Sequence, residues 1–166
     1  NLFEVTRLEG GTAVYRKDRI PAVKLMKEAE QRYADLVRDN GIQFSAEAEE
    51  GMELQVDGNK IWSVLDNLVY NAIRHTPAGG SISLSIRRNG SQAELKVSDT
   101  GEGIAPEHLP HIFERFYKVS PERGEKDGSS GLGLYIVKTV VEAMGGTVEA
   151  ESPPGNGTVF TIRFNE

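Results

Sequence analysis

Polar side chains recur on one side of the apolar segment at residues 57–75. At about 100° per residue on a helix, these polar residues gather on one face and the apolar residues on another. The polar stripe consists of Asn67, Asn71, Arg74 and His75. Amide oxygens are hard ligands suited to Mg²⁺, and arginine pairs with phosphate through its planar guanidinium group. The stripe can therefore hold a metal ion and a polyphosphate, although an ordinary solvated helix face uses the same residue types.

The segment Asp99–Ile104, Asp-Thr-Gly-Glu-Gly-Ile, directly follows a predicted strand. A carboxylate at a strand end, here Asp99, can accept a hydrogen bond from the exocyclic amine of adenine. Gly101 and Gly103 allow the backbone to pass close to a flat ring. The segment therefore predicts a site that reads a nucleobase. The alternative is a turn that only ends the strand.

The segment Gly128–Leu134, Gly-Ser-Ser-Gly-Leu-Gly-Leu, runs straight into a predicted helix. Small residues at a helix N-terminus leave free amide donors and the positive end of the helix dipole directed at one spot. This pattern favours a phosphate-binding site over a flexible linker, because a linker would not pass at once into a strongly apolar helix. The glycine order matches neither the P-loop nor the dinucleotide fingerprint, so a different nucleotide-binding fold is required.

Aromatic residues gather in the segment Ile112–Lys118. Arg115 or Lys118 could reach phosphate oxygens, and the aromatic side chains could close over a ligand or dock on a partner. Phe113 and Phe116 suit equally well a short amphipathic helix that anchors the segment to the core. The two interpretations are compatible, and both are kept.

A scaffold must position these residues, and the periodicity of the chain predicts three full helices. They span Ala22–Asp39, Asp57–His75 and Leu132–Met144. Asp57 is expected to cap the second helix, and a short helical pattern at residues 1–11 looks like the tail of a longer helix. Alternating apolar residues predict strands, and Asn89-Gly90 predicts a tight hairpin. The predicted strands are Thr12–Arg16, Ile42–Ala46, Met52–Val56, Ile82–Ile86, Ala93–Val97, Thr147–Ser152 and Thr158–Phe164.

Helices and hairpins in this order predict an α/β fold of the α+β kind. We expect a two-layer sandwich in which about three helices cover one face of a mixed, mostly antiparallel sheet. Residues 99–130 lose periodicity and contain many glycine, proline and charged residues, so we expect a functional lid there.

The composition narrows the class of protein. A length of 166 residues fits one domain, and a net charge of −6 without a basic run argues against a nucleic-acid-binding surface. The absence of cysteine excludes disulfides and thiolate metal sites. No stretch of the sequence is long and apolar enough to cross a membrane, and no signal peptide begins it. Because the chain starts at Asn1 without a methionine, we expect a piece of a longer protein.

Together these segments resemble the ATP-binding catalytic domain of bacterial sensor histidine kinases. That family lies in the group that also contains DNA gyrase B, Hsp90 and MutL and shares a Bergerat-type fold. The resemblance spans nearly the whole chain and rests on five motifs in the family's order. They are the N box at Asn67–His75, the G1 box at Asp99–Gly103, the F box at Phe113–Tyr117, the G2 box at Gly128–Gly133 and the G3 turn at Gly155–Thr158.

The resemblance implies ATP and Mg²⁺ as cofactors and a role for each motif. Asn71 would be a ligand of Mg²⁺, Asn67 would lie near the phosphates, Asp99 would bind adenine, and the G2 amides would wrap the triphosphate. Arg74 stands where lysine is frequent, and His75 stands where tyrosine often stacks on the base, or it is a cation at the helix C-terminus. The residues expected to contact ATP are Asn67, Asn71, Arg74, His75, Asp99, Gly101, Gly103, Ile104, Tyr117, Lys118, Gly128, Ser129, Ser130, Gly131, Leu132, Gly133, Leu134 and Thr158.

The family passes the γ-phosphoryl group of ATP to a histidine on a separate two-helix dimerisation domain. None of His75, His108 and His111 lies in the HE-rich helical motif that such an acceptor needs. Residues 1–11 resemble the end of the second dimerisation helix, which leaves residues 12–166 as the catalytic domain. The chain is therefore expected to bind Mg-ATP without phosphorylating itself, the acceptor histidine lying upstream.

The resemblance also implies partners and a location. The expected partners are the protein's own dimerisation domain and a response regulator, with a homodimer for the full-length protein and a monomer for this piece. The expected location is a cytoplasmic domain of a protein in the bacterial inner membrane. One alternative is a serine kinase of the anti-sigma-factor type, which the F box and residues 1–11 disfavour. Another is a nucleotide-gated clamp of the MutL or gyrase kind, which usually continues into a second α/β domain.

Overall fold

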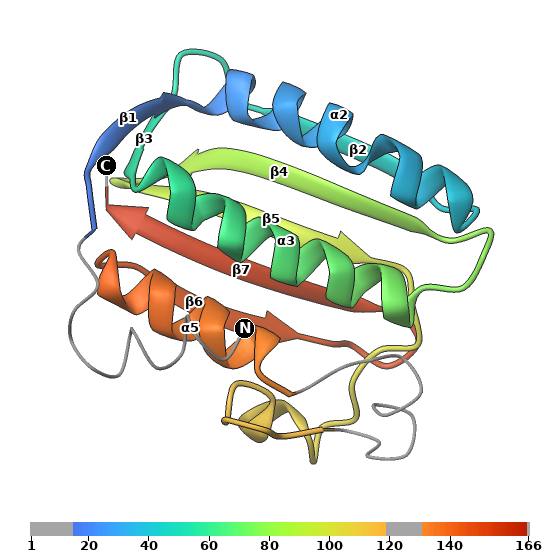
Figure 1. Ribbon diagram of the computed structural model, residues 1–166. Helices are drawn as coiled ribbons and strands as arrows, with labels where there is room; N and C mark the ends of the chain where they lie inside the picture. The colour runs from blue at the N-terminus through green and yellow to red at the C-terminus, as the bar shows by residue number, and fades with distance from the viewer. Residues whose placement is uncertain (1–14, 119–130, 166) are drawn as a thin grey trace.

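The computed structural model describes residues 15–118 and 131–165 (Figure 1). The described helices are α2 (Ala22–Asp39), α3 (Gly58–His75) and α5 (Gly133–Ala143), with a short 3-10 turn η1 at Leu109–His111. The described strands are β1 (Asp18–Pro21), β2 (Gln43–Ala48), β3 (Glu53–Val56), β4 (Ser81–Asn89), β5 (Gln92–Asp99), β6 (Thr147–Glu151) and β7 (Thr158–Asn165).

Five strands form the main sheet in the order β2-β4-β5-β7-β6. In the main sheet only the β2–β4 pair is parallel, because β3 and α3 intervene between these strands in the chain, whereas the other neighbours run antiparallel. Strands β1 and β3 make a separate antiparallel pair. Figure 1 shows α2, α3 and α5 on the same face of the main sheet, with α3 in the middle. The predicted two-layer sandwich with a mixed, mostly antiparallel sheet is confirmed.

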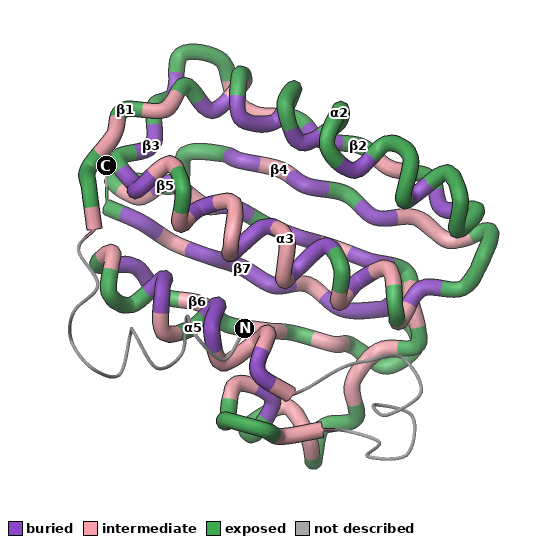
Figure 2. Tube along the Cα trace, in the orientation of Figure 1, coloured by how far each residue is buried: buried purple, intermediate pink, exposed green. Residues whose placement is uncertain are grey.

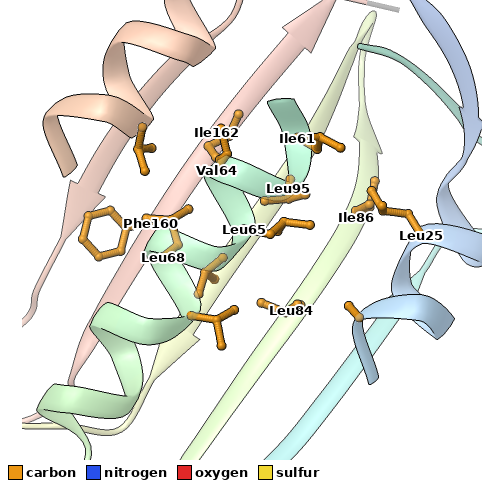
Figure 3. Close-up of a cluster of buried hydrophobic side chains, with 14 of the residues drawn as sticks. Leu25, Ile61, Val64, Leu65, Leu68, Leu84, Ile86, Leu95, Phe160 and Ile162 are labelled. Carbon is orange, nitrogen blue, oxygen red and sulfur yellow. The ribbon is translucent and has the colours of Figure 1, made fainter. Parts of the chain in front are cut away.

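The core lies between this helical layer and the sheet, and it follows from the periodicity of the sequence. In β5, and in β4 as far as Ile86, every second residue is buried, as expected for strands with one covered face (Figure 2). Figure 3 shows Leu65 and Leu68 of α3 packed towards Leu84, Leu95 and other apolar side chains of the sheet. This packing fixes the rotation of α3 and therefore decides which of its residues face away from the core.

Helix α3 begins at a cap that the sequence identifies. Asp57 is 4% exposed, and its carboxylate accepts hydrogen bonds from the N–H groups of Asn59 (2.9 Å), Lys60 (3.2 Å) and Arg16 (3.0 Å). Burial alone would raise the pKa of Asp57, but these three backbone donors together outweigh it and hold that pKa below its usual value. The charged form of Asp57 therefore stabilises the fold.

The variant Asp57→Ala is expected to lower the free energy of unfolding by about 1–2 kcal/mol, because three partly buried backbone donors lose their acceptor. Asp57→Asn keeps one acceptor oxygen and should lose less. Since the pKa is lowered on folding, the contribution of Asp57 is present at neutral pH and disappears as the pH falls through its folded-state pKa. Urea unfolding at pH 7 and below pH 4 measures both effects. A stability difference that persisted unchanged in acid would contradict this role.

The first predicted strand is wrong in position. Tyr15 and Arg16 lie outside any strand, and β1 begins at Asp18 instead, whereas residues 12–14 lie outside the described residues. The pairing explains the shift, since β1 pairs with β3 from Asp18 opposite Val56 onwards. The segment 1–11 and residues 119–130 of the expected lid also lie outside the described part of the chain. Among the described helices, none has the length and apolarity needed to span a membrane.

Candidate functional site

The C-terminal end of α3, the end of β5 and the start of β7 meet at one corner of the sandwich (Figure 1). The register of the antiparallel β5–β7 pair places Asp99 opposite Thr158. Both residues are buried, at 7% and 4% exposure. Asp99 and Thr158 lie 59 positions apart in the sequence. They are neighbours because their strands pair.

Asp99 is a buried carboxylate held by backbone donors. Its Oδ1 accepts the N–H of Gly101 at 2.9 Å, and the N–H of Thr158 also donates to this carboxylate. Burial raises the pKa of Asp99, and these two donors and the positive charge of His75 oppose the rise only in part. A buried carboxylate with raised pKa is costly to the fold, and such costs are typical of binding or catalytic groups.

Gly101 lies against the last residue of α3 with no room for a side chain. A Cβ atom at Gly101 would come within 2.2 Å of the carbonyl oxygen of His75 and 3.0 Å of Asp99 Oδ1. The next residue, Glu102, donates its N–H to that same carbonyl oxygen at 3.2 Å. The turn after β5 is therefore fixed directly on the end of α3.

Substituting Gly101→Ala should destabilise the fold by about 1–3 kcal/mol, because the new methyl group overlaps backbone that cannot move independently. Gly58→Ala is the matched control, since its Cβ would approach only the carboxylate of Asp18, at 3.1 Å, and the end of the Ile20 side chain, at 3.6 Å. Neither glycine has a positive φ, so backbone strain does not enter the comparison. Equal unfolding midpoints for the two variants in urea would contradict the close contact at Gly101.

A hydroxyl group joins the turn after β5 to the turn before β7. Ser152 Oγ accepts the N–H of Ile104 at 2.7 Å and donates to the carbonyl oxygen of Gly157 at 2.6 Å. Ser152 Oγ also lies 3.3 Å from Thr158 Oγ1, and a Cβ at Gly103 would lie 2.9 Å from Ser152 Oγ. Sequence reasoning missed Ser152, because its role depends on a contact across 48 residues. A polar residue directly before the turn at residues 153–157 was the only local signal.

A second group of residues lies where α3 passes the start of α5. Asn67 donates its Nδ2 to Ser63 O at 2.8 Å, and its Oδ1 would lie 3.0 Å from a Cβ placed on Gly133. Helix α5 starts at Gly133, and among the described residues its N-cap, Leu132, makes no side-chain capping hydrogen bond. The first-turn N–H groups and the positive end of the helix dipole therefore remain suited to an anion.

The other polar residues of the α3 stripe lie between these two groups. Asn71 is half-buried, one turn after Asn67 and one turn before His75, and Arg74 is exposed. His75 is half-exposed, and its Nδ1 lies 2.8 Å from Glu102 Oε1. The helix therefore presents the expected stripe along one side, from the start of α5 to the turn after β5.

The aromatic segment 112–118 divides into an anchored part and an exposed part. The ring of Phe113 packs edge-on against Phe160 at 6.1 Å, which supports the anchoring interpretation for this residue. Phe116 is 55% exposed with a positive φ of 64°, and its N–H donates to Gly131 O at 2.9 Å. Tyr117 has its hydroxyl 2.5 Å from His108 Nδ1. The segment therefore contacts the end of the glycine-rich loop directly.

The comparison with known proteins decides the family. Residues 56–166 match the family described as Histidine kinase-, DNA gyrase B-, and HSP90-like ATPase. The chain belongs to this family. It is therefore an ATP-binding domain, and the family predicted from the five motifs is confirmed.

Individual members of the ATPase family support the same conclusion. The chain is 36% identical to the sensor protein DivL of Caulobacter vibrioides, over 100% of this chain and 21% of DivL. It is 35% identical to the sensor-like histidine kinase SenX3 of Mycobacterium tuberculosis, over 97% of this chain and 39% of SenX3. The structure of full-length ShkA in complex with AMPPNP superposes with a TM-score of 0.81 at 26% identity, over 98% of this chain and 34% of ShkA. The chain thus spans well under half the length of these relatives.

Within this ATPase domain, the structure brings several of the expected contact residues together. Asp99, Gly101, Gly103, Ile104, Thr158 and His75 share one corner, and Asn67, Leu132, Gly133 and Leu134 share the start of α5. Gly131 contacts the backbone of Phe116, and Lys118 is half-buried at the edge of the described segment. Gly128, Ser129 and Ser130 lie outside the described residues.

Proposed function

We propose that the chain is the catalytic domain of a two-component sensor histidine kinase. Such a domain transfers the γ-phosphoryl group of ATP to a histidine on a dimerisation domain. Family membership and the similarity to SenX3 support this proposal. The observation that carries it is one continuous stripe along α3, which runs from the uncapped start of α5 to the corner that holds Asp99.

The two ends of this stripe suit the two ends of ATP. Asp99 offers a buried acceptor to the exocyclic amine of adenine. The free amides at the start of α5 suit the phosphates, and Arg74 adds a positive charge from the exposed side of the stripe. The base would therefore bind at the corner and the triphosphate towards α5.

Asn71 is the residue proposed to hold Mg²⁺ with the phosphates. Its amide lies between the two ends, half-buried, one helical turn from Asn67 and from His75. An amide oxygen is a hard ligand, and Mg²⁺ in proteins typically binds few side chains and completes its shell with phosphate oxygens and water. When bound, the ion would neutralise negative charge on the transferring phosphoryl group.

This chain would supply only the nucleotide half of the reaction. We propose that residues 12–166 form the catalytic domain and that residues 1–11 end the second dimerisation helix. The acceptor histidine would then lie upstream, which is consistent with relatives much longer than this chain. Phosphoryl transfer depends on the positioning of the acceptor histidine beside the γ-phosphate and on neutralisation of the phosphate charge. The acceptor would be positioned only when the histidine-bearing domain docks on this one.

The same proposal defines partners and location. The domain would act on its own dimerisation domain in a homodimeric parent protein, and the phosphoryl group would pass on to a response regulator. This piece alone would be monomeric. The parent protein would sit in the bacterial inner membrane with this domain in the cytoplasm, in keeping with a role in sensing like that of the named sensor relatives.

Incubation with γ-labelled ATP and Mg²⁺ tests the proposed activity. The chain alone should remain unlabelled, because it lacks the acceptor. Addition of the parent protein's separately produced histidine-bearing domain should give label on that added domain, stable in base and lost in acid, as expected for phosphohistidine. The matched control is the same added domain with its acceptor histidine changed to glutamine.

Each other outcome contradicts the proposal in a recognisable way. Label on the chain itself would show an acceptor within these 166 residues. Acid-stable label on serine would favour the serine kinase alternative. Hydrolysis of ATP with no labelled protein would favour the nucleotide-gated clamp.

A further inference from the structure

Glu102 contacts His75 at two points on the rim of the proposed adenine site. The N–H of Glu102 donates to the carbonyl oxygen of His75 at 3.2 Å, and Glu102 Oε1 lies 2.8 Å from His75 Nδ1. The first contact is made by the backbone and survives any substitution of the side chain. The second contact requires the carboxylate of Glu102, which lies between two glycines in the sequence, and the imidazole of His75 at the end of α3.

These contacts form a short path to Asp99. Glu102 follows Gly101, whose N–H holds Asp99 Oδ1 at 2.9 Å, and Gly101 itself fits between the two groups without room for a side chain. A shift of Glu102 away from α3 would therefore move the donor that orients the Asp99 carboxylate. His75 also ends the stripe that carries Asn71 one turn earlier, so the same contact holds the turn after β5 against the helix that carries Asn71.

The charges of the two side chains matter as well as their contact. The His75 and Glu102 side chains are 35% and 41% exposed, and an ion pair this exposed is worth little to the stability of the whole fold. Its effect on the buried Asp99 is direct, because positive charge on His75 favours the ionised carboxylate and negative charge on Glu102 opposes it. Arg74 is the next charged residue on α3, and it is exposed.

We propose that His75 and Glu102 are a positioning pair, which holds the turn after β5 against α3 and so tightens the adenine end of the site. This inference rests on the proposed ATP site. The pair acts through Asp99 and is not itself required for chemistry.

A double-mutant cycle in nucleotide affinity tests the pair. The dissociation constant of the non-hydrolysable analogue AMPPNP would be measured by calorimetry for the wild type, His75→Gln, Glu102→Gln and the double variant. The coupling between the two positions should be about threefold to fivefold.

His75→Arg separates charge from shape, because arginine always carries its charge. Paired with Glu102→Gln in the same cycle, it should also show coupling. Absence of coupling between positions 75 and 102 in the histidine cycle would overturn the proposal.

The failure of this inference can be told apart from the failure of the proposed function. If the wild type binds AMPPNP and Asp99→Asn does not, but the cycle shows no coupling, the positioning pair is refuted and the ATP site stands. If neither AMPPNP binding nor an effect of Asp99→Asn is detected, the proposed site itself is refuted, and the pair falls with it.

Discussion

Asp99→Asn is expected to weaken ATP binding by about 100-fold or more. The change keeps the size of the side chain and an oxygen that can still accept the N–H of Gly101, so the turn after β5 should survive. The second oxygen becomes an NH₂ group, which would meet the donor on the adenine ring or the N–H of Thr158. An unpaired donor in a buried site costs about 1–3 kcal/mol in addition to the lost hydrogen bond. The free energy of the lost hydrogen bond and the cost of the unpaired donor together account for the expected loss in ATP affinity.

Calorimetric titration with AMPPNP measures this loss. Asp35→Asn serves as the control, because it removes a carboxylate that is 83% exposed on α2. The far-ultraviolet circular dichroism of the two variants should match the wild type, which confirms that the fold is intact. An Asp99→Asn protein that bound AMPPNP as tightly as the control would exclude Asp99 as the residue that reads the base.

Two buried aspartates in this domain differ in how far backbone donors offset the effect of burial on the carboxylate pKa. Asp57 and Asp99 are both nearly inaccessible, and burial acts to raise both pKa values. At Asp57 three backbone donors reverse the effect, so the charged form stabilises the fold. At Asp99 the backbone donors only partly offset the effect of burial, so the pKa remains raised. The charged form of Asp99 therefore lowers the stability of the fold. A carboxylate kept at such a cost is best explained by a ligand that completes its hydrogen bonds.

Much of the fold could be predicted because its signals are local. The bounds of α2 follow from an apolar stripe and the Asn40-Gly41 end, and Asp57 identifies the start of α3. The hairpin between β4 and β5 follows from Asn89-Gly90 between two alternating segments. The exception is β1, since a short edge strand is positioned by its partner β3 rather than by its own sequence.

The candidate site was predictable in its motifs but not in its connections. Asp99 and the stripe on α3 stood out because their residue types suit a nucleotide at positions where packing gives no reason for them. Ser152 and Glu102 did not stand out, since each acts through a contact that exists only after the strands have paired and α3 has docked. Local patterns identify groups that carry chemistry, whereas the groups that orient them depend on tertiary structure.

The largest effect on phosphoryl transfer is expected from Asn71→Ala. The alanine keeps the helix, since it is the best helix former, and removes only the amide proposed to hold Mg²⁺. ATP should then bind with an affinity that no longer responds to Mg²⁺. Transfer to the added histidine-bearing domain should fall by about 100-fold or more, because charge neutralisation by the ion is worth several kcal/mol in such reactions.

Asn59→Ala at the opposite end of α3 is the matched control, because Asn59 is exposed and lies outside the stripe. Titrations of ATP with Mg²⁺ and with EDTA should differ for the wild type and for this control, and coincide for Asn71→Ala. A Mg²⁺ response that survived in Asn71→Ala would place the ion on other ligands. A lost response in Asn71→Ala together with an intact response in Asp99→Asn would separate the metal end of the site from the adenine end, because Asn71 lies on α3 and Asp99 lies at the end of β5.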